Sequence, residues 1–473
     1  YSYLDRVLSA LAGEAVGDFL PLPKYADFQV RATLALREQA SVSMTAFGSL
    51  DELRRAHAVA DAATAQAETW QRTFYRIGLR YEHRQHAQIS VMPWLGLDHN
   101  RYIAQFADIP ATAEQRDLRY GLRASYSELL RDWLTLSVGV DLAFAYSDLM
   151  RQGTLTRPAR EGDRAVFGQH PGKEVAADSY STFLADLASY LSLVVRIGRL
   201  RIEPGLRISA LLIDVSRLLP RVGAAPPIGA RQNLLLAEPR LLLRYQPVQR
   251  LLLFAAAGLY HQPPDPADLS AVFGNPTLGA SRAVSVSTGA TLSLTTLLEA
   301  ELSGYYRALD RLVMRSTLLT PPLARALTQE GSGHSYGAQI LIRLLPWRDL
   351  SAMLSYGIGR ALRRDSPSLP LRLADFDQTH TVQASARYVL WGFGLSVRFR
   401  FTTGTPRTEV TGSYFDASSD VYQPIFGPIN AIRLPPFVQL DAQLDRTFSL
   451  GKGVSLSLSV DVQNEKKKKN AEE

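Results

Sequence analysis

The feature that most constrains this chain is a period-two alternation of apolar and polar side chains over most of its 473 residues. In residues 133–146 one face would carry Leu134, Leu136, Val138, Val140, Leu142, Phe144 and Tyr146, and the other face small or polar residues. Residues 393–402 and 454–463 repeat the pattern. Because successive side chains of a strand point to opposite faces, this alternation predicts β-strands with one apolar and one polar face.

The same alternation recurs along the rest of the chain, at about 28–37, 40–50, 70–84, 87–98, 114–127, 177–192, 195–212, 231–246, 249–261, 282–294, 297–312, 334–346, 349–362, 376–390 and 435–449. Strands in globular proteins run nearer five or six residues, whereas a tilted strand of about ten residues crosses a membrane. We therefore predict an all-β fold, a transmembrane antiparallel β-barrel that forms one domain over residues 1–473. A short strand at Tyr1–Val7 brings the expected number to about 19.

The connections between these segments alternate in length. Short turns at 37–40, 345–349 and 450–453 contrast with long loops at 51–69, 148–176, 213–230, 262–281, 313–333 and 405–434. Short turns at one end and long loops at the other are typical of outer-membrane barrels. The segment 51–69 is polar and helix-prone, and we expect it to be either a short helix or mobile.

The tryptophans fall near the ends of the predicted strands. They are Trp70, Trp94, Trp133, Trp347 and Trp391. Positions near strand ends favour an aromatic girdle at the membrane interfaces over filling of core gaps.

Composition excludes several other classes. The chain has no cysteine, so it has no disulfide framework and no thiolate metal site. Its net charge is +7, but the arginines are spread through strand-like segments, which argues against a nucleic-acid partner. The apolar runs, such as 251–260, are shorter than the roughly 20 residues of a spanning helix.

No catalytic motif emerges, and we predict that the chain is not an enzyme and needs no cofactor. The turn at 450–453 lacks the spacing of a phosphate-binding loop. His83 and His86 are three residues apart, which on one strand would place them on opposite faces, so we expect no metal site there.

The polar strand face is the candidate functional surface, because in a membrane barrel it lines the lumen. Its candidate ligand-facing residues are Arg201, Glu203, Arg207, Arg387, Arg398, Arg400, Asp441 and Asp445, with Asp461 following. One interpretation is a charged lumen that guides an anionic solute or holds a plug. The other is lateral pairing of arginines with carboxylates within the wall. Residues 413–430, rich in aromatic and polar side chains, could contact a ligand or a surface partner, or only pack over the barrel mouth.

Several segments resemble TonB-dependent outer-membrane receptors, and they keep that family's order. They are YSYLD (1–5), FGSLDEL (47–53), EPRLLLRY (238–245), GLYHQPP (258–264), FGNPTL (273–278), GSGHSYGAQILIR (331–343), FDQTH (376–380), FTTGTP (401–406), RLPPFVQLD (433–441) and LSVDVQN (458–464). The resemblance implies a 22-stranded barrel with a plug inside it. On that template Tyr1 falls near the end of the third strand, and 458–464 is strand 21. The plug, the TonB box, the first strands and the last strand are then expected to lie outside this chain.

By this resemblance the expected function is energy-coupled uptake of a scarce bulky solute, such as a metal chelate or other nutrient, in the bacterial outer membrane. The implied partners are outer-membrane lipid and, if the full chain has a plug, a TonB-type complex. The alternative is a non-transporting scaffold for surface or periplasmic proteins, such as a surface lipoprotein. A passive porin is a third hypothesis. The lysine run 466–469 is expected where strand 21 enters its extracellular loop, facing anionic lipid.

Overall fold

A computed structural model of the chain describes residues 22–57, 66–106, 109–154, 160–163, 175–217, 229–318, 323–417, 421–451 and 453–465. The strands are β1 (Leu22–Arg37), β2 (Ala40–His57), β3 (Gln66–Arg84), β4 (Ala87–Phe106), β5 (Ile109–Arg131), β6 (Leu134–Thr154), β7 (Val175–Ile197), β8 (Leu200–Arg217), β9 (Ala230–Val248), β10 (Leu251–Gln262), β11 (Ser281–Ser293), β12 (Leu298–Arg315), β13 (Leu327–Trp347), β14 (Leu350–Arg364), β15 (Arg372–Leu373), β16 (His380–Leu390), β17 (Phe393–Thr402), β18 (Pro406–Arg407), β19 (Val410–Asp416), β20 (Val421–Phe426), β21 (Ile432–Arg433), β22 (Phe437–Gly451) and β23 (Val454–Glu465). One short 3-10 helix, η2 (Pro266–Leu269), follows β10.

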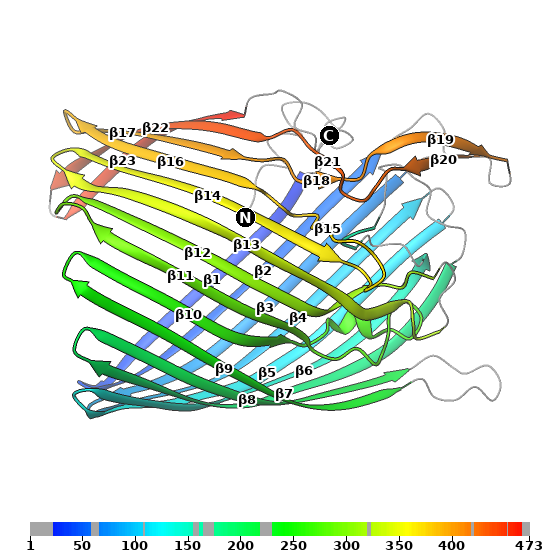
Figure 1. Ribbon diagram of the computed structural model, residues 1–473, viewed down its shortest axis with the longest axis horizontal. Helices are drawn as coiled ribbons and strands as arrows, with labels where there is room; N and C mark the ends of the chain where they lie inside the picture. Colours follow the sequence, from blue (N-terminus) through cyan, green and yellow to red (C-terminus); the bar gives the residue numbers. More distant parts are fainter. Residues whose placement is uncertain are drawn as a thin grey trace.

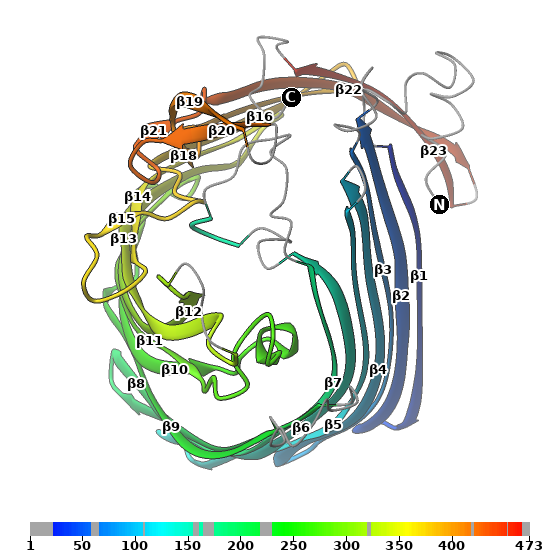
Figure 2. The same ribbon diagram turned by 90° about the vertical axis from the view of Figure 1, so that its right-hand side faces the viewer.

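The long strands form one antiparallel sheet in which each strand pairs with the next along the chain (Figure 1). The sheet counts 19 strands, including the two-residue β15. Figure 2 shows that it curls around a central lumen. Within the described residues β1 pairs only with β2 and β23 only with β22. The predicted all-β antiparallel fold is therefore confirmed, and every predicted strand from residue 28 onward is present.

Several strands are longer than the alternation indicated, although β16 begins at His380 and is shorter than the segment expected at 376–390. The segment expected at 114–127 is part of β5, which spans Ile109–Arg131, and the one expected at 177–192 is part of β7, which spans Val175–Ile197. Where a hairpin extends beyond the membrane, both of its faces contact water. Its sequence there no longer alternates between apolar and polar residues, although the backbone pairing continues. The predicted strand at 1–7 and the lysine run 466–469 lie outside the described residues.

The expectation of a helix in 51–69 is wrong for the described part of that segment. Residues 51–57 complete β2, and residues 66–69 begin β3. The register from Asp51 opposite Arg72 to His57 opposite Gln66 shows why, because the backbone groups are already used in the ladder. Residues 58–65 lie outside the described part. No helix among the described residues is long and apolar enough to cross a membrane.

The inner and outer faces of the sheet follow from the register. Leu269 of η2 and Leu278 lie inside the ring of strands and pack on Leu184 and Ile213, which defines that face as the inner one. On this face the polar residues of the alternation line the lumen. The outer face carries exposed apolar side chains such as Ile77, Leu118 and Leu302. The barrel thus turns its apolar face outward, as a membrane requires.

Two of the five tryptophans do not lie where the girdle hypothesis puts them. Trp70 and Trp94 are on the inner face, opposite Leu53 and Gly121 respectively. The hypothesis is wrong for both, because their positions in the alternation point them into the lumen. Trp133, Trp347 and Trp391 lie at the short-turn end and are 52%, 50% and 84% exposed.

Gly121 makes room for the indole ring of Trp94. A Cβ atom at Gly121 would lie 2.2 Å from the Leu142 carbonyl oxygen and 2.8 Å from the Trp94 ring. We expect Gly121→Ala to lower the free energy of unfolding by about 1–3 kcal/mol, because both neighbours must move. Urea titration of the full-length protein in vesicles would measure this change.

Gly78→Ala is the matched control for Gly121→Ala. Gly78 is also an inner-face strand glycine, but the nearest atoms to its added Cβ would be 3.9 Å away. We expect this variant to be unchanged or more stable by a few tenths of a kcal/mol, because alanine restricts the unfolded chain. Equal losses in the two variants would contradict a specific fit of Trp94 against Gly121.

Candidate ligand pathway through the barrel lumen

Ion pairs run across the inner wall from strand to strand. Asp98 of β4 lies 2.6 Å from Arg76 of β3 and 3.0 Å from Arg119 of β5. Arg119 also lies 2.7 Å from Asp117, which is almost fully buried. The strand register places opposite charges side by side, so this part of the wall neutralises itself.

The three predicted residues on β8 belong to the same kind of network. Arg201 pairs with Glu203 at 2.7 Å. Arg207 lies 3.0 Å from Asp141 and 3.1 Å from Asp186. These contacts match the lateral-pairing interpretation for β8. A role of these residues in binding a ligand remains a prediction.

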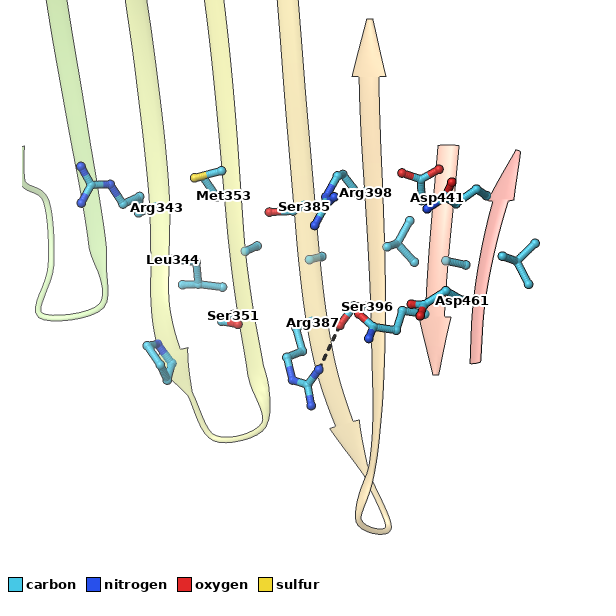
Figure 3. Close-up of a pocket in the computed structure, with 18 of the residues that line it drawn as sticks. Arg343, Leu344, Ser351, Met353, Ser385, Arg387, Ser396, Arg398, Asp441 and Asp461 are labelled. Carbon is cyan, nitrogen blue, oxygen red and sulfur yellow. Dashed lines mark hydrogen bonds between the residues drawn. The ribbon is translucent and has the colours of Figure 1, made fainter. Parts of the chain in front are cut away.

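The other five predicted residues lie together on β16, β17 and β22. Arg387 and Asp445 are near the short-turn end, whereas Arg400 is near the long-loop end of β17. Arg387 makes a two-pronged contact with Asp445, at 2.5 and 2.8 Å, and donates to the Ser396 hydroxyl at 3.1 Å (Figure 3). Arg398 lies directly opposite Asp441, and Arg400 lies opposite Gln439. Within the described part of the chain neither Arg398 nor Arg400 has an ion-pair partner.

Three of these residues, Arg387, Arg398 and Asp441, border a concave region of about 420 Å³ on the inner wall. Arg398, Asp441 and Asp461 line it from three neighbouring strands, as Figure 3 shows, and Arg343 of β13 lies at its edge. The β8 residues are not part of it. The predicted set therefore divides into a self-paired group on β8 and a mixed-charge group with two exposed, unpaired guanidinium groups on β17.

The loop between β10 and β11 folds into the lumen, which the alternation did not reveal (Figure 2). Leu269 and Leu278 are 0% and 1% exposed there. The Ser270 hydroxyl donates to Asp178 at 2.7 Å, and the amide of Gln329 both accepts from the Gly279 N–H at 2.9 Å and donates to its carbonyl at 2.7 Å. Apolar residues in an otherwise polar long loop were the only sequence signal for this packing.

A second, more apolar cavity lies between this inward loop and the wall of β1 to β7. Its volume is about 550 Å³. Trp70 and Tyr102 lie along one side in a tilted ring contact, with ring centroids 4.3 Å apart. Ala267 and Ser270 of the inward loop face them across the cavity, and Arg72 contributes a cation to its lining. We call this space the aromatic cavity. It lies at the long-loop end of the lumen, because Trp70 and Tyr102 belong to the ends of β3 and β4 far from their short turn.

Residues 160–163 tie the long loops together at the same end. Arg160 pairs with Asp268 of the inward loop, with one contact at 3.0 Å, and Asp163 pairs with Arg315 at 2.5 Å. Burial lowers the pKa of the Arg160 guanidinium, but the hydrogen bond and charge of Asp268, together with the charges of Asp163 and Asp265, raise it by more, so that its pKa lies above the usual value. The inward loop is therefore held by residues 160–163 at the long-loop end as well as by its contacts with the wall.

The described residues contain no group of three or more histidine, aspartate or glutamate side chains that could hold a metal ion. His83 is the second-last residue of β3, whereas His86 lies in the following turn. The two histidines therefore do not share a strand, because β3 ends at Arg84.

A large antiparallel barrel with an apolar outer face, a charged lumen and long loops at one end defines an outer-membrane receptor-type barrel. The family model described as TonB dependent receptor-like, beta-barrel matches residues 19–464. The chain belongs to this family and is a bacterial outer-membrane β-barrel. No curated protein sequence matches it.

Solved structures of this type share its fold at low sequence identity. The unliganded ferric citrate transporter FecA is 15% identical with a TM-score of 0.68, and the match covers 94% of this chain and 65% of FecA. The ferric yersiniabactin uptake receptor FyuA from Yersinia pestis is 12% identical, with a TM-score of 0.67 and coverages of 93% and 69%. The copper transporter OprC is 13% identical, with a TM-score of 0.65 and coverages of 93% and 66%. The family and these structures are receptors and transporters rather than enzymes.

Proposed function

We propose that this barrel serves energy-coupled uptake of a scarce, bulky solute, a metal chelate or another nutrient, with a TonB-type complex as its partner. Membership of the receptor family supports the proposal at the level of the fold. The chain spans 65% of the length of FecA, so the uptake cycle of the whole protein is part of the proposal.

The aromatic cavity is the observation that carries the proposal. Its volume of about 550 Å³ is within the range of small-molecule sites. Trp70 is 43% exposed although it faces the lumen, so its ring is available to a ligand. A mostly apolar space with a few charged groups such as Arg72 is typical of a binding site.

The β16–β22 wall fits a later stage of the same pathway. Arg398 and Arg400 lie nearer along β17 to its short turn than Trp70 lies along β3 to its own, so they are deeper than the aromatic cavity. Neither has an ion-pair partner among the described residues. Unpaired guanidinium groups in a confined space attract anions. An anionic solute that leaves the aromatic cavity would meet these two arginines next.

Uptake of labelled solutes by cells tests the proposal. Cells that lack the full-length protein and cells that carry it would be compared with ⁵⁵Fe-citrate and with copper(II), each with and without an uncoupler. These probes are chosen because FecA is a ferric citrate transporter and OprC a copper transporter. Uptake that needs the protein and stops with the uncoupler supports the proposal. Uptake that continues with the uncoupler indicates a passive pore and contradicts it.

Trp70→Ala is expected to weaken binding of the transported solute by roughly five- to tenfold, because loss of one aromatic contact costs about 1 kcal/mol. The measurement is the concentration for half-maximal uptake. Trp391→Ala is the matched control, because Trp391 is 84% exposed in a short turn and far from the cavity. Equal effects of the two substitutions would remove the aromatic cavity from the pathway.

The β19–β20 hairpin favours a second candidate, the non-transporting scaffold. It extends from the long-loop end (Figure 1), and Tyr414 and Tyr422 on it are 56% and 73% exposed. Aromatic side chains on such a hairpin fit contact with a surface protein. A scaffold predicts that cells without the protein lose a surface partner but show no change in uptake of either solute.

A further inference from the structure

A row of tyrosines marks one membrane boundary on the outer face of β12, β13 and β14. Tyr306, Tyr336 and Tyr356 point outward, as the register with their apolar neighbours requires. Toward the short turns the outward positions of β13 are apolar: Ala338, Ile340, Ile342 and Leu344. Tyrosine is enriched where the apolar membrane core meets the headgroups.

Nitrogen-bearing side chains lie on and beyond this row. His334 makes stacked contacts with both Tyr306 and Tyr336, at ring-centroid distances of 6.3 and 6.1 Å. His380 stacks on Tyr356 at 6.2 Å, and its Nδ1 is 3.0 Å from the Tyr356 hydroxyl. When that hydroxyl donates to Nδ1, the ring carries its proton on Nε2, which can then donate outward.

Arg360 adds a full positive charge to the same surface. It lies directly opposite Tyr336 in the register, and its side chain is exposed. Within the described residues its side chain has neither an ion pair nor a hydrogen bond. The carboxylates of the following loop are already used, since Asp365 pairs with Arg372 and Asp377 with Arg433.

The other side of the barrel is different. On the outer face of β4 and β5, His99 and Arg116 both contact Glu114, at 2.9 and 2.7 Å. Those two side chains therefore already have a carboxylate partner. The contrast singles out the surface formed by Tyr306, His334, Tyr336, Tyr356, Arg360 and His380, which we call the tyrosine–cation patch.

We propose that the tyrosine–cation patch binds the phosphate of a phosphorylated lipid headgroup at the long-loop side of the membrane. The arginine supplies the charge, the imidazoles supply further donors, and the tyrosines hold the neighbouring acyl and sugar region. The patch adjoins the apolar outer surface of the barrel, so a lipid of the bilayer can reach it directly. This lipid contact is separate from solute uptake through the lumen.

Native mass spectrometry of the full-length protein in detergent tests the proposal, with diphosphoryl lipid A, its dephosphorylated form and inorganic phosphate as probes. We expect diphosphoryl lipid A to remain bound and dephosphorylated lipid A to bind at least tenfold more weakly. Arg360→Glu is expected to reduce binding of the diphosphoryl form by roughly tenfold, because each cation near an anionic lipid surface contributes about 1 kcal/mol and the substitution also adds a negative charge.

Arg446→Glu is the matched control. Arg446 also points outward, but it lies at the short-turn end over Phe393. It should leave lipid A binding unchanged. Equal binding of the two lipid A forms, equal effects of Arg360→Glu and Arg446→Glu, or displacement of the lipid by an equal concentration of inorganic phosphate would each overturn the proposal. If Arg360→Glu does not fold, Arg360→Gln replaces it, with a smaller expected loss of about three- to fivefold.

Discussion

Leu302→Arg is expected to lower the free energy of unfolding of the barrel by about 2–4 kcal/mol, the largest single effect that we predict on the wall. Leu302 is 57% exposed on the outer face of β12. It lies midway between Leu298, near a short turn, and Tyr306, at the opposite boundary. A guanidinium at this position would sit near the middle of the bilayer, where it loses its hydration. Urea titration in phospholipid vesicles would measure the change.

The neighbouring substitution Ser303→Arg supplies the control. Ser303 lies one residue further along the same strand and faces the lumen, opposite Gly289 and Gln339. An arginine there stays in water, so we expect a change within about 0.5 kcal/mol. Similar losses for both variants would contradict the assignment of the inner and outer faces. A larger loss for Ser303→Arg would reverse it.

Leu269→Ala is expected to release the inward loop from the lumen wall. Leu269 is fully buried against Leu184, Ile213 and Leu278. Truncation of such a side chain costs about 2–5 kcal/mol, which falls on the attachment of the loop because the wall strands keep their own ladders. Thermolysin, which cuts beside apolar residues, should then cleave within residues 263–280 at least tenfold faster than in the unchanged protein.

Leu318→Ala is the control for the inward loop. Leu318 is 58% exposed at the same end of the barrel, so its loss should leave the cleavage rate unchanged. Because Ala267 and Ser270 form one side of the aromatic cavity, Leu269→Ala should also weaken solute binding. Unchanged cleavage in Leu269→Ala would show that the polar contacts of Ser270 and Gln329 hold the loop without the leucine.

The residues of the lumen wall show how much of the structure the alternation could predict. The alternation predicted the strands from residue 28 to residue 463, and it predicted which face of each strand is polar. It therefore placed Arg387, Arg398 and Asp441 on one surface before any contact was known. Which of them form ion pairs depends on the register between neighbouring strands. The alternation within one strand does not specify that register. Arg387 proves to pair with Asp445, whereas Arg398 is unpaired within the described part of the chain.

The sequence alone determined the class of this protein. Segments of ten or more residues with a period-two alternation can be stable in a membrane only as a β-barrel whose apolar face points outward. Only the tertiary structure decided the contents of the lumen. Trp70 and Trp94 face inward, and a long loop packs on the inner wall through Leu269 and Leu278. These features depend on contacts between segments far apart in the chain. The local alternation of residues does not predict which of these segments will pack together.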